Sequence, residues 1–349
     1  MAPADDALQR WRHGQVRSAR LIGLARGGHH RRPHDSGAVC ASPGSCAGTG
    51  CVTDLAGGRI GFKAAPQEVD WATLDATWAA AGEYGVFDAA WLNDHLTDSG
   101  QEHGGKSIEG LTLAATLAYR VPSKWIGHSV LSNTFRHPAV LAKAATVLDQ
   151  ATGGRFIVGL GAGWHEGEHE EFGIPLPPIG ERISRLESAV SVLHALFSPE
   201  AQTPPGVTLG DRFYPLRGAT NDPGPVRPGG PPIWLGGQKP RGIALAARAA
   251  DGWLTPGNRA GDIAYFVDRR DALLRSFEAI GRDPSGFQFA GQVICGADPA
   301  QRREALEAAL SLVRAGATHM ILGLPAAAGP EPLRAAAKEV AEPLRDVFA

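Results

Sequence analysis

The run FIVGLG, from Phe156 to Gly161, is apolar or glycine at every position and follows the turn sequence TGGR. A strand covered on one face alternates apolar and polar residues, whereas a parallel strand covered on both faces is apolar throughout. A segment with helical spacing follows, from Glu181 to Phe197. The stretch therefore predicts one strand–helix unit of a parallel α/β fold.

The same unit repeats from Arg59 to the end of the chain. We predict eight strands, at Arg59–Phe62, Phe87–Leu92, Trp125–Val130, Phe156–Gly161, Pro232–Gly237, Asp251–Pro256, Phe287–Cys295 and Thr318–Leu324. A helix is predicted after each strand, at Asp70–Tyr84, Glu109–Tyr119, Pro138–Gln150, Glu181–Phe197, Pro240–Ala250, Asp262–Ile280, Pro299–Ala315 and Pro332–Val340. Eight units predict a single (β/α)8 TIM barrel over residues 59–349. A doubly wound open sheet is the alternative, and the number of units favours the barrel.

Two segments lie outside this alternation. Residues 198–232, after the fourth helix, are rich in Pro and Gly and contain VTLGDRFYPL, which predicts a hairpin inserted in the barrel. Residues 1–58 have no lasting hydrophobic period, so we predict a disordered extension or a start codon placed too early. Cys40, Cys46 and Cys51 lie there with His29, His30 and His34. A zinc site is the weaker interpretation, because the C-x2-C pairs typical of such sites are missing.

The composition is that of an ordinary globular protein. The chain has 349 residues, a net charge of -2 and 43% hydrophobic residues. The balanced charge argues against nucleic acid or an anionic membrane as the main partner. There is no run of about 18 apolar residues, so no segment is expected to span a membrane. With only four cysteines, we predict a cytoplasmic protein without structural disulfides.

Polar residues collect where the predicted strands end, which is where barrel enzymes place their active sites. They are Lys63, Asn93, Asp94, His95, Ser129, Val130, Ser132, Asn133, Thr134, Gly161, Ala162, Gly163, Trp164, Gly236, Gly237, Gln238, Lys239, Pro256, Gly257 and Asn258. The set contains many Gly and neutral hydrogen-bonding groups, and it lacks the His-x-His pattern of a metal-dependent hydrolase. It predicts a large, flat ligand with polar edges and no metal.

Each motif in this set has a plain structural alternative. GLGAGW, from Gly159 to Trp164, only partly matches a dinucleotide fingerprint, and a strand end that allows close approach is the simpler interpretation. GGQKPRG, from Gly236 to Gly242, is either a phosphate-binding helix start or a tight turn with two solvated cations. His95 could cap a helix instead of acting in catalysis. The acidic residues of WHEGEHEEFG, from Trp164 to Gly173, are interpreted as a solvated loop face.

Together, several stretches resemble the bacterial-luciferase-like superfamily, and most closely its branch that uses the deazaflavin coenzyme F420. In chain order they are NDHL, HSVLSNTFRHPAVLAKAATVLDQATGGR, FIVGLGAGWHEGEHEEFGIPLPP and PPIWLGGQKPRGIALAARAADGWLTPG. The resemblance covers nearly the whole chain after residue 58. It implies a (β/α)8 barrel with the flavin-type ring across the strand ends, and it suggests a homodimer.

The resemblance also implies site residues. Asp94 and His95 match the reacting edge of the ring, and Ser129–Val130 matches a non-prolyl cis peptide bond against it. Taken together with the strand-end positions above, the cofactor-binding set is expected to be Lys63, Asp94, Ser129, Val130, Asn133, Gly161, Gly163, Gly236, Gly237, Gln238 and Lys239. The catalytic set is expected to be His95, Asp94 and Glu109, with Glu109 orienting His95. Trp164 stands where a sugar-phosphate branch has an acidic residue, so that substrate is not expected.

The resulting hypothesis is F420-dependent hydride transfer between C5 of the deazaflavin and a small organic substrate, with His95 donating a hydrogen bond or exchanging a proton. The first alternative is an FMN-dependent monooxygenase that activates oxygen. The second is a homologue that binds flavin without catalysis. A hydrolase or aldolase barrel is more distant, because it would need a metal or a Schiff-base lysine, and Lys63 is the only candidate.

Overall fold

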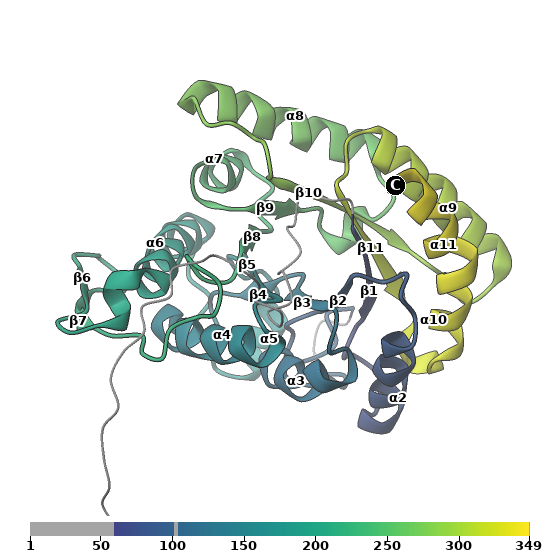
Figure 1. Ribbon diagram of the computed structural model, residues 1–349, viewed down its shortest axis with the longest axis horizontal. Helices are drawn as coiled ribbons and strands as arrows, with labels where there is room; N and C mark the ends of the chain where they lie inside the picture. The colour runs from purple at the N-terminus through teal and green to yellow at the C-terminus, as the bar shows by residue number, and fades with distance from the viewer. Residues whose placement is uncertain (1–58, 101–103, 349) are drawn as a thin grey trace, which may run out of the picture. The chain divides into compact units, whose positions relative to one another are not determined.

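The structure, a computed structural model, describes residues 59–100 and 104–348 (Figure 1). Eight parallel strands form a ring that is closed by pairing between the third and fourth of them. They are β1 Arg59–Ala64, β2 Ala89–Leu92, β3 Trp125–His128, β5 Phe156–Gly161, β8 Ile233–Leu235, β9 Gly252–Leu254, β10 Gln288–Ile294 and β11 His319–Leu324. The predicted TIM barrel is confirmed. The predictions for residues 1–58 lie outside the described residues.

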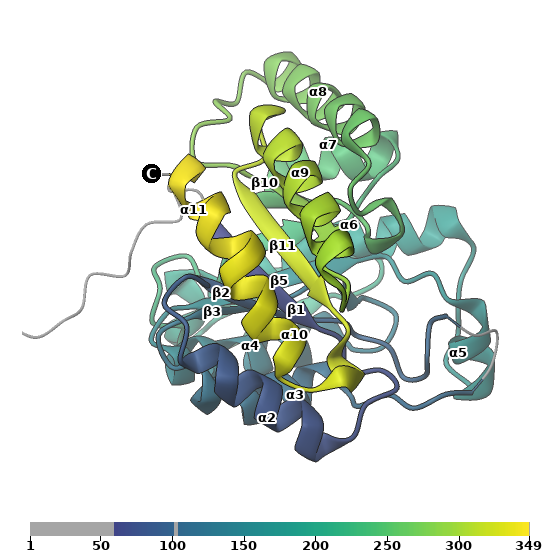
Figure 2. The same ribbon diagram turned by 90° about the vertical axis from the view of Figure 1, so that its right-hand side faces the viewer.

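Helices surround the ring and follow the strands in the predicted order (Figures 1 and 2). The main ones are α2 Trp71–Gly82, α3 Gly110–Leu117, α4 Pro138–Thr152, α6 Ile179–Phe197, α7 Pro240–Ala249, α8 Ile263–Ile280 and α9 Pro299–Arg314. The predicted last helix is a continuous helical run made of α10 Glu331–Ala336, the π-helical η5 Ala337–Ala341 and α11 Glu342–Phe348. Short 3-10 turns lie at η1 Ala118–Arg120, η2 Pro199–Gln202, η3 Gly257–Arg259 and η4 Ala326–Ala328. Within the described part of the chain, every helix is too short or too polar to cross a membrane.

Local sequence signals explain where several helices begin. The side chain of Asp70 accepts a hydrogen bond from the Thr73 backbone N–H and caps α2. Asp298 and Gln301 form a reciprocal capping box at the start of α9. Such caps satisfy backbone donors that the first turn leaves without a partner. The helix starts could therefore be predicted from short-range patterns.

Three elements refine the predicted order. The third strand stops at His128 and resumes as β4 Leu131–Ser132, on either side of a cis peptide bond between Ser129 and Val130. The expected cis bond is thus present. The long loop after β5 contains a short helix, α5 Glu166–Glu171, which the sequence did not predict. The insertion after α6 forms the predicted hairpin, with β6 Val207–Leu209 antiparallel to β7 Leu216–Ala219.

Bulky rings fill the barrel interior below the carboxyl ends of the strands. Trp91, Trp234 and His319 come from three strands, and their ring centroids lie 5.2–5.3 Å apart. The indole N–H of Trp91 donates to Nε2 of His319 at 3.1 Å, and burial lowers the pKa of His319 to about 3. Gly61 and Gly127 leave room for Trp91, since a Cβ at either would lie within 2.7 Å of its ring. This packed layer closes the barrel beneath the candidate site.

Candidate functional site

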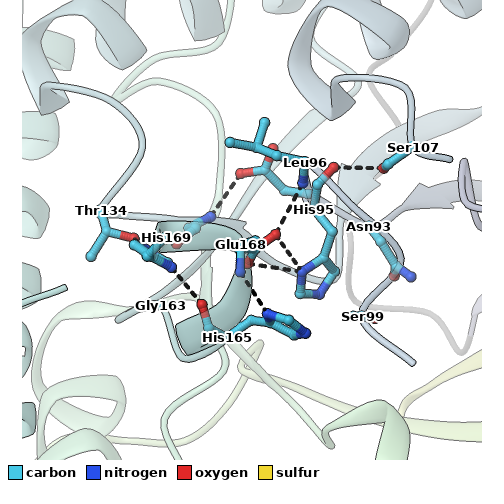
Figure 3. Close-up of polar contacts among 12 residues, drawn as sticks. Asn93, His95, Leu96, Ser99, Ser107, Thr134, Gly163, His165, Glu168 and His169 are labelled. Atoms are coloured by element: carbon cyan, nitrogen blue, oxygen red, sulfur yellow. Dashed lines mark hydrogen bonds and ion pairs between the residues drawn. The ribbon is translucent and has the colours of Figure 1, made fainter. Parts of the chain in front are cut away.

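His95 is held by a carboxylate from a distant part of the chain (Figure 3). Its Nδ1 lies 3.1 Å from Oε1 of Glu168, in α5, and the backbone N–H of Leu96 donates to Oε2 of the same residue at 3.0 Å. A carboxylate can only accept, so Nδ1–H is the donor. Glu168 is 2% exposed and the His95 side chain 15%. No described residue hydrogen-bonds Nε2 of His95, so this nitrogen remains available to a ligand.

The sequence did not identify Glu168. The acidic stretch after Trp164 was interpreted as a solvated face, but α5 turns Glu168 inward, where it is buried. His165 caps α5 by accepting from the Glu168 backbone N–H at 3.0 Å. The expectation that Glu109 orients His95 is therefore wrong, because Glu168 makes this contact. The only local signal is a cap His three residues before a Glu, which predicts a short helix but not its partner.

Asp94, next to His95, turns to a different set of partners. Both of its oxygens accept from Arg136, at 2.6 and 2.7 Å, and Oδ2 also accepts from the Ser132 backbone N–H at 2.8 Å. Arg136 bonds Glu109 as well, and Glu109 caps α3. Asp94 is 2% exposed. Its carboxylate thus joins the end of β2 to β4, and protein donors already occupy both oxygens.

The charges in this cluster stabilise one another. Burial alone would raise the pKa of Glu109, but hydrogen bonds from Thr112 and the charge of Arg136 lower it to about 2. Burial would likewise lower the pKa of Arg136, yet Asp94 and Glu109 raise it above its ordinary value. Both partners are therefore charged over the whole physiological pH range. Such a buried network is rigid, and removing one member leaves an unpaired charge.

A polar row crosses the barrel above the aromatic layer. The ammonium of Lys63 donates to Oε1 of Gln292 at 2.6 Å, and Nε2 of Gln292 donates to Oγ of Ser129 at 3.2 Å and to the Thr255 carbonyl. These residues come from β1, β10 and the end of β3, which are alternate strands of the barrel, as in a TIM-barrel layer. Burial lowers the pKa of Lys63 to about 8. We call Lys63, Gln292 and Ser129 the floor row.

Small residues lie beside the floor row. Val130 packs against Gly161 and Gly236. A Cβ added to Gly161 would lie 2.6 Å from Cγ2 of Val130, and a Cβ added to Gly236 would lie 3.3 Å from the same atom. Gly163 has φ 81°, and a Cβ at this position would clash with the side chains of Ser132 and Thr134. Asn133 is 5% exposed, and its side-chain oxygen has no hydrogen-bond partner in the described chain. Glycine at positions 161 and 236 thus accommodates the Val130 side chain, and Asn133 provides one unused acceptor at the strand ends.

The turn between β8 and α7 is held by the neighbouring strand and helix. The Gln238 amide donates to the carbonyls of Gly236 and Leu254, at 2.8 and 2.9 Å. The Trp253 indole N–H donates to the Gly237 carbonyl at 3.0 Å. A Cβ on Gly237 would lie 2.7 Å from Cα of Gly242, so the turn and the start of α7 touch backbone to backbone. Gln238 therefore shapes the turn through its own hydrogen bonds.

The two cations at this turn, Lys239 and Arg241, have different surroundings. Lys239 is exposed and precedes α7, and its side chain does not cap the first N–H groups of that helix. Arg241 instead reaches α6, where its guanidinium donates to Glu187 at 2.7 Å. An anion at the start of α7 would meet Lys239 and the helix dipole.

A cavity of about 720 Å³ lies between α5 and the start of α6, within the usual range for small-molecule sites. It is lined by Glu166, His169, Glu170, Gly173, Ile174, Pro175, Leu176, Pro177, Pro178, Ile179 and Arg182. His169 connects it to the segment after β4, because its Nε2 lies 2.7 Å from Oγ1 of Thr134. Arg182 donates to the Gly163 carbonyl at 2.5 Å. Two of the lining residues, His169 and Arg182, thus hydrogen-bond to residues that follow β4 and β5.

The chemical capacity of the site follows from these groups. Among residues 59–100 and 104–348, no group of three or more His, Cys, Asp or Glu could hold a metal ion. Cys295 is buried, which raises its thiol pKa to about 12, so it is no thiolate nucleophile at neutral pH. What remains is a His–carboxylate pair, a buried amine and neutral hydrogen-bonding groups. These can bind and orient an organic ring and move a proton.

The fold and these residues together define a (β/α)8 barrel protein with a candidate ligand site at the carboxyl ends of its strands. Residues 62–347 match the luciferase-like monooxygenase family, and the chain belongs to this family. The sequence is 32% identical over 225 residues to an F420-dependent glucose-6-phosphate dehydrogenase of Nakamurella multipartita. That match covers 64% of this chain and 63% of the relative, so the chain spans under two thirds of the relative's length.

Solved structures share the fold. A monooxygenase from Streptomyces bottropensis superposes with a TM-score of 0.68 and 19% identity, over 83% of this chain and 100% of that one. An F420-dependent secondary alcohol dehydrogenase, solved with an F420-acetone adduct, gives a TM-score of 0.63 and 19% identity, over 77% and 93%. At such low identity, these similarities support the barrel fold alone.

Proposed function

We propose that this chain is an F420-dependent oxidoreductase that transfers a hydride between the deazaflavin and a small organic substrate. The observation that carries the proposal is the His95–Glu168 pair, which fixes one imidazole nitrogen and leaves the other to a ligand. The similarity to an F420-dependent dehydrogenase supports the choice of cofactor. As predictions, we retain a homodimer in the cytoplasm.

The residues at the strand ends fit a flat, polar-edged ring. Gly161 and Gly236 let Val130 pack against the strand ends, because a Cβ at either position would crowd its methyl groups. Lys63 and the free side-chain oxygen of Asn133 provide a donor and an acceptor for the ring's edges. When bound, the deazaflavin supplies a carbon, C5, that accepts or releases a hydride. Lys63, Ser129, Val130 and Asn133 form the ring-binding surface in this proposal.

The protein's own groups then handle the proton and the geometry. Glu168 holds the His95 ring in one orientation and in the tautomer with the proton on Nδ1. His95 accepts a proton from the substrate at Nε2, or returns it in the reverse direction. Trp164 packs edge-on against His95, with ring centroids 5.6 Å apart, and shields the imidazole on that side. Asp94 acts as a positioning residue, because its oxygens are engaged by Arg136 and Ser132.

The turn at Gly236–Lys239 holds the cofactor's phosphate in this proposal. Gly237→Val would place a Cβ against the Gly242 backbone and displace the start of α7. We expect at least a tenfold loss of affinity for F420, measured by fluorescence titration, because the helix N–H groups would no longer face the phosphate. The affinity for a deazaflavin without the phosphate-bearing tail should change less than threefold. Equal losses for both ligands would contradict the assignment of this turn.

Gly210→Val is the matched control for that variant. Gly210 lies in the inserted hairpin, has an ordinary φ, and has no atom within 4 Å of an added Cβ. The same substitution there should leave the dissociation constants of both deazaflavins unchanged.

Cofactor identity is tested by titrating the purified protein separately with F420 and with FMN. The proposal expects a dissociation constant for F420 at least tenfold below that for FMN, together with F420 reduction when a substrate is supplied. Tighter FMN binding, with oxygen consumption by the reduced complex, would favour the monooxygenase alternative. Binding of F420 without turnover of any tested alcohol or carbonyl compound would favour a non-catalytic flavin-binding homologue.

A further inference from the structure

Lys63 is a buried cation for which the described protein provides little compensation. The residue is 8% exposed, and its ammonium has one hydrogen-bond acceptor, Oε1 of Gln292. An ammonium carries three N–H donors, so two of them remain unused. No carboxylate of the described chain forms an ion pair with it. A buried charge in this state is costly unless a ligand completes its shell.

Gln292 fixes the position of this charge. Its amide nitrogen donates to the Thr255 carbonyl and to Oγ of Ser129, so the amide oxygen is the atom that faces Lys63. Gln292 is itself 1% exposed and belongs to β10, the longest strand of the barrel. The ammonium is therefore held at the floor row by a rigid neutral partner. The ammonium charge of Lys63 can therefore interact with a ligand bound against the floor row.

The other buried lysine provides a comparison. Lys124 is 3% exposed and lies just before the amino end of β3, whereas Lys63 lies near the carboxyl end of β1. The Lys124 ammonium donates to the carbonyls of Tyr84 and Phe87 at 2.7 and 2.9 Å. Two protein acceptors thus serve the Lys124 ammonium, whereas one serves Lys63. The difference indicates that Lys63 is set up for an external acceptor.

We propose that Lys63 stabilises negative charge on the bound redox ring and thereby shifts the cofactor's equilibrium toward its reduced form. This inference rests on the proposed function and deepens it. The ligand recognised is an anionic or carbonyl-bearing edge of a ring lying on the floor row. Gln292 acts as the positioning residue for the ammonium.

The charge balance of the reaction explains the direction of the effect. The hydride carries two electrons and one proton from a substrate carbon to the ring, so the substrate is oxidised and the ring is reduced. The substrate's second proton goes to Nε2 of His95. The ring system therefore gains one negative charge, and a cation buried beside it favours the more negative state. Burial also lowers the pKa of Lys63 to about 8, so the charge is present at neutral pH.

The test compares Lys63→Met with the wild type by the dissociation constants of oxidised F420 and of F420 reduced with borohydride. We expect the ratio of the oxidised to the reduced dissociation constant to fall at least tenfold, because only the reduced form loses a large stabilisation. For a two-electron couple, tenfold corresponds to a decrease of about 30 mV in the midpoint potential of the bound cofactor. Lys63→Arg, which keeps the charge, should recover part of the ratio.

Lys124→Met is the matched control and should leave the ratio within a factor of two. Lys63→Met is expected to fold, because it replaces a poorly solvated cation with an apolar chain of similar length. Lys63→Gln is a second neutral variant. Thermal melting checks that both variants are folded. An unchanged ratio in both neutral variants would overturn the inference while F420 binding still supported the proposed function. If wild-type protein bound neither form of F420, the proposed function would fail first.

Discussion

Replacing His95 with alanine is expected to lower kcat by about 10²- to 10⁴-fold, the usual contribution of a positioned acid–base group. The affinity for F420 should change less than threefold, because the floor row and the turn before α7 bind the ring and phosphate in our proposal. The physical reason is that Glu168 holds Nδ1 of His95, whereas Nε2 has no hydrogen-bond partner among the described residues and can face the substrate. Steady-state kinetics together with F420 titration separates the two effects.

Two further measurements decide whether the lost group is an imidazole that moves a proton. Added imidazole should restore part of the activity of His95→Ala, because the substitution leaves a space the size of the lost ring in which Glu168 can still accept a hydrogen bond. Glu168→Gln should also lower kcat, but less than His95→Ala, because a neutral amide oxygen still accepts from Nδ1–H and keeps the ring in place. A kcat of His95→Ala within threefold of wild type would show that the residue has no catalytic role.

Arg136→Met is expected to destabilise the protein by about 3–5 kcal/mol, the usual cost of removing one partner from a buried ion pair. The Asp94 side chain is fully buried, and the substitution would leave its carboxylate without its bidentate partner. Urea unfolding should show a lower midpoint with an unchanged slope. The double variant Arg136→Met with Asp94→Asn should recover part of the loss, because the amide removes the stranded charge.

Arg120→Met provides the matched control. Arg120 also makes a bidentate pair, with Asp75 at 2.7 Å for both hydrogen bonds, but its side chain is 49% exposed. Exposed pairs contribute about 0–1 kcal/mol, so this variant should unfold close to the wild-type midpoint. Equal destabilisation by Arg120→Met and Arg136→Met would mean that burial of the Asp94 pair does not matter.

The two residues of the Asp94–His95 motif have separate roles in the structure. Asp94 organises the β2, β4 and α3 ends through Arg136, whereas His95 faces Glu168 from α5. The resemblance treated both as contacts to the ring, and for Asp94 the occupied oxygens favour a positioning role. This division explains why His95→Ala is expected to lower turnover, whereas Arg136→Met, which removes the partner of Asp94, is expected to lower stability.

The order of elements was accessible from the sequence because it depends on short-range patterns. Apolar runs such as FIVGLG, helix caps such as Asp70 and the Pro/Gly-rich insertion each act within a few residues. The strand-end positions of His95, Lys63 and Gly236 followed from the barrel, since parallel strands place their carboxyl ends together. The short α5 was missed because its six residues carry no apolar periodicity.

The partners of those residues were decided by the tertiary structure alone. Glu168 lies 73 residues from His95, Arg136 lies 42 from Asp94, and Gln292 lies 229 from Lys63. No local pattern encodes such contacts, because they arise only when the closed barrel brings separate strand ends to one place. The sequence by itself thus determined which chemical groups reach the site. Barrel closure determined which of them are paired, which are buried and which remain available to a ligand.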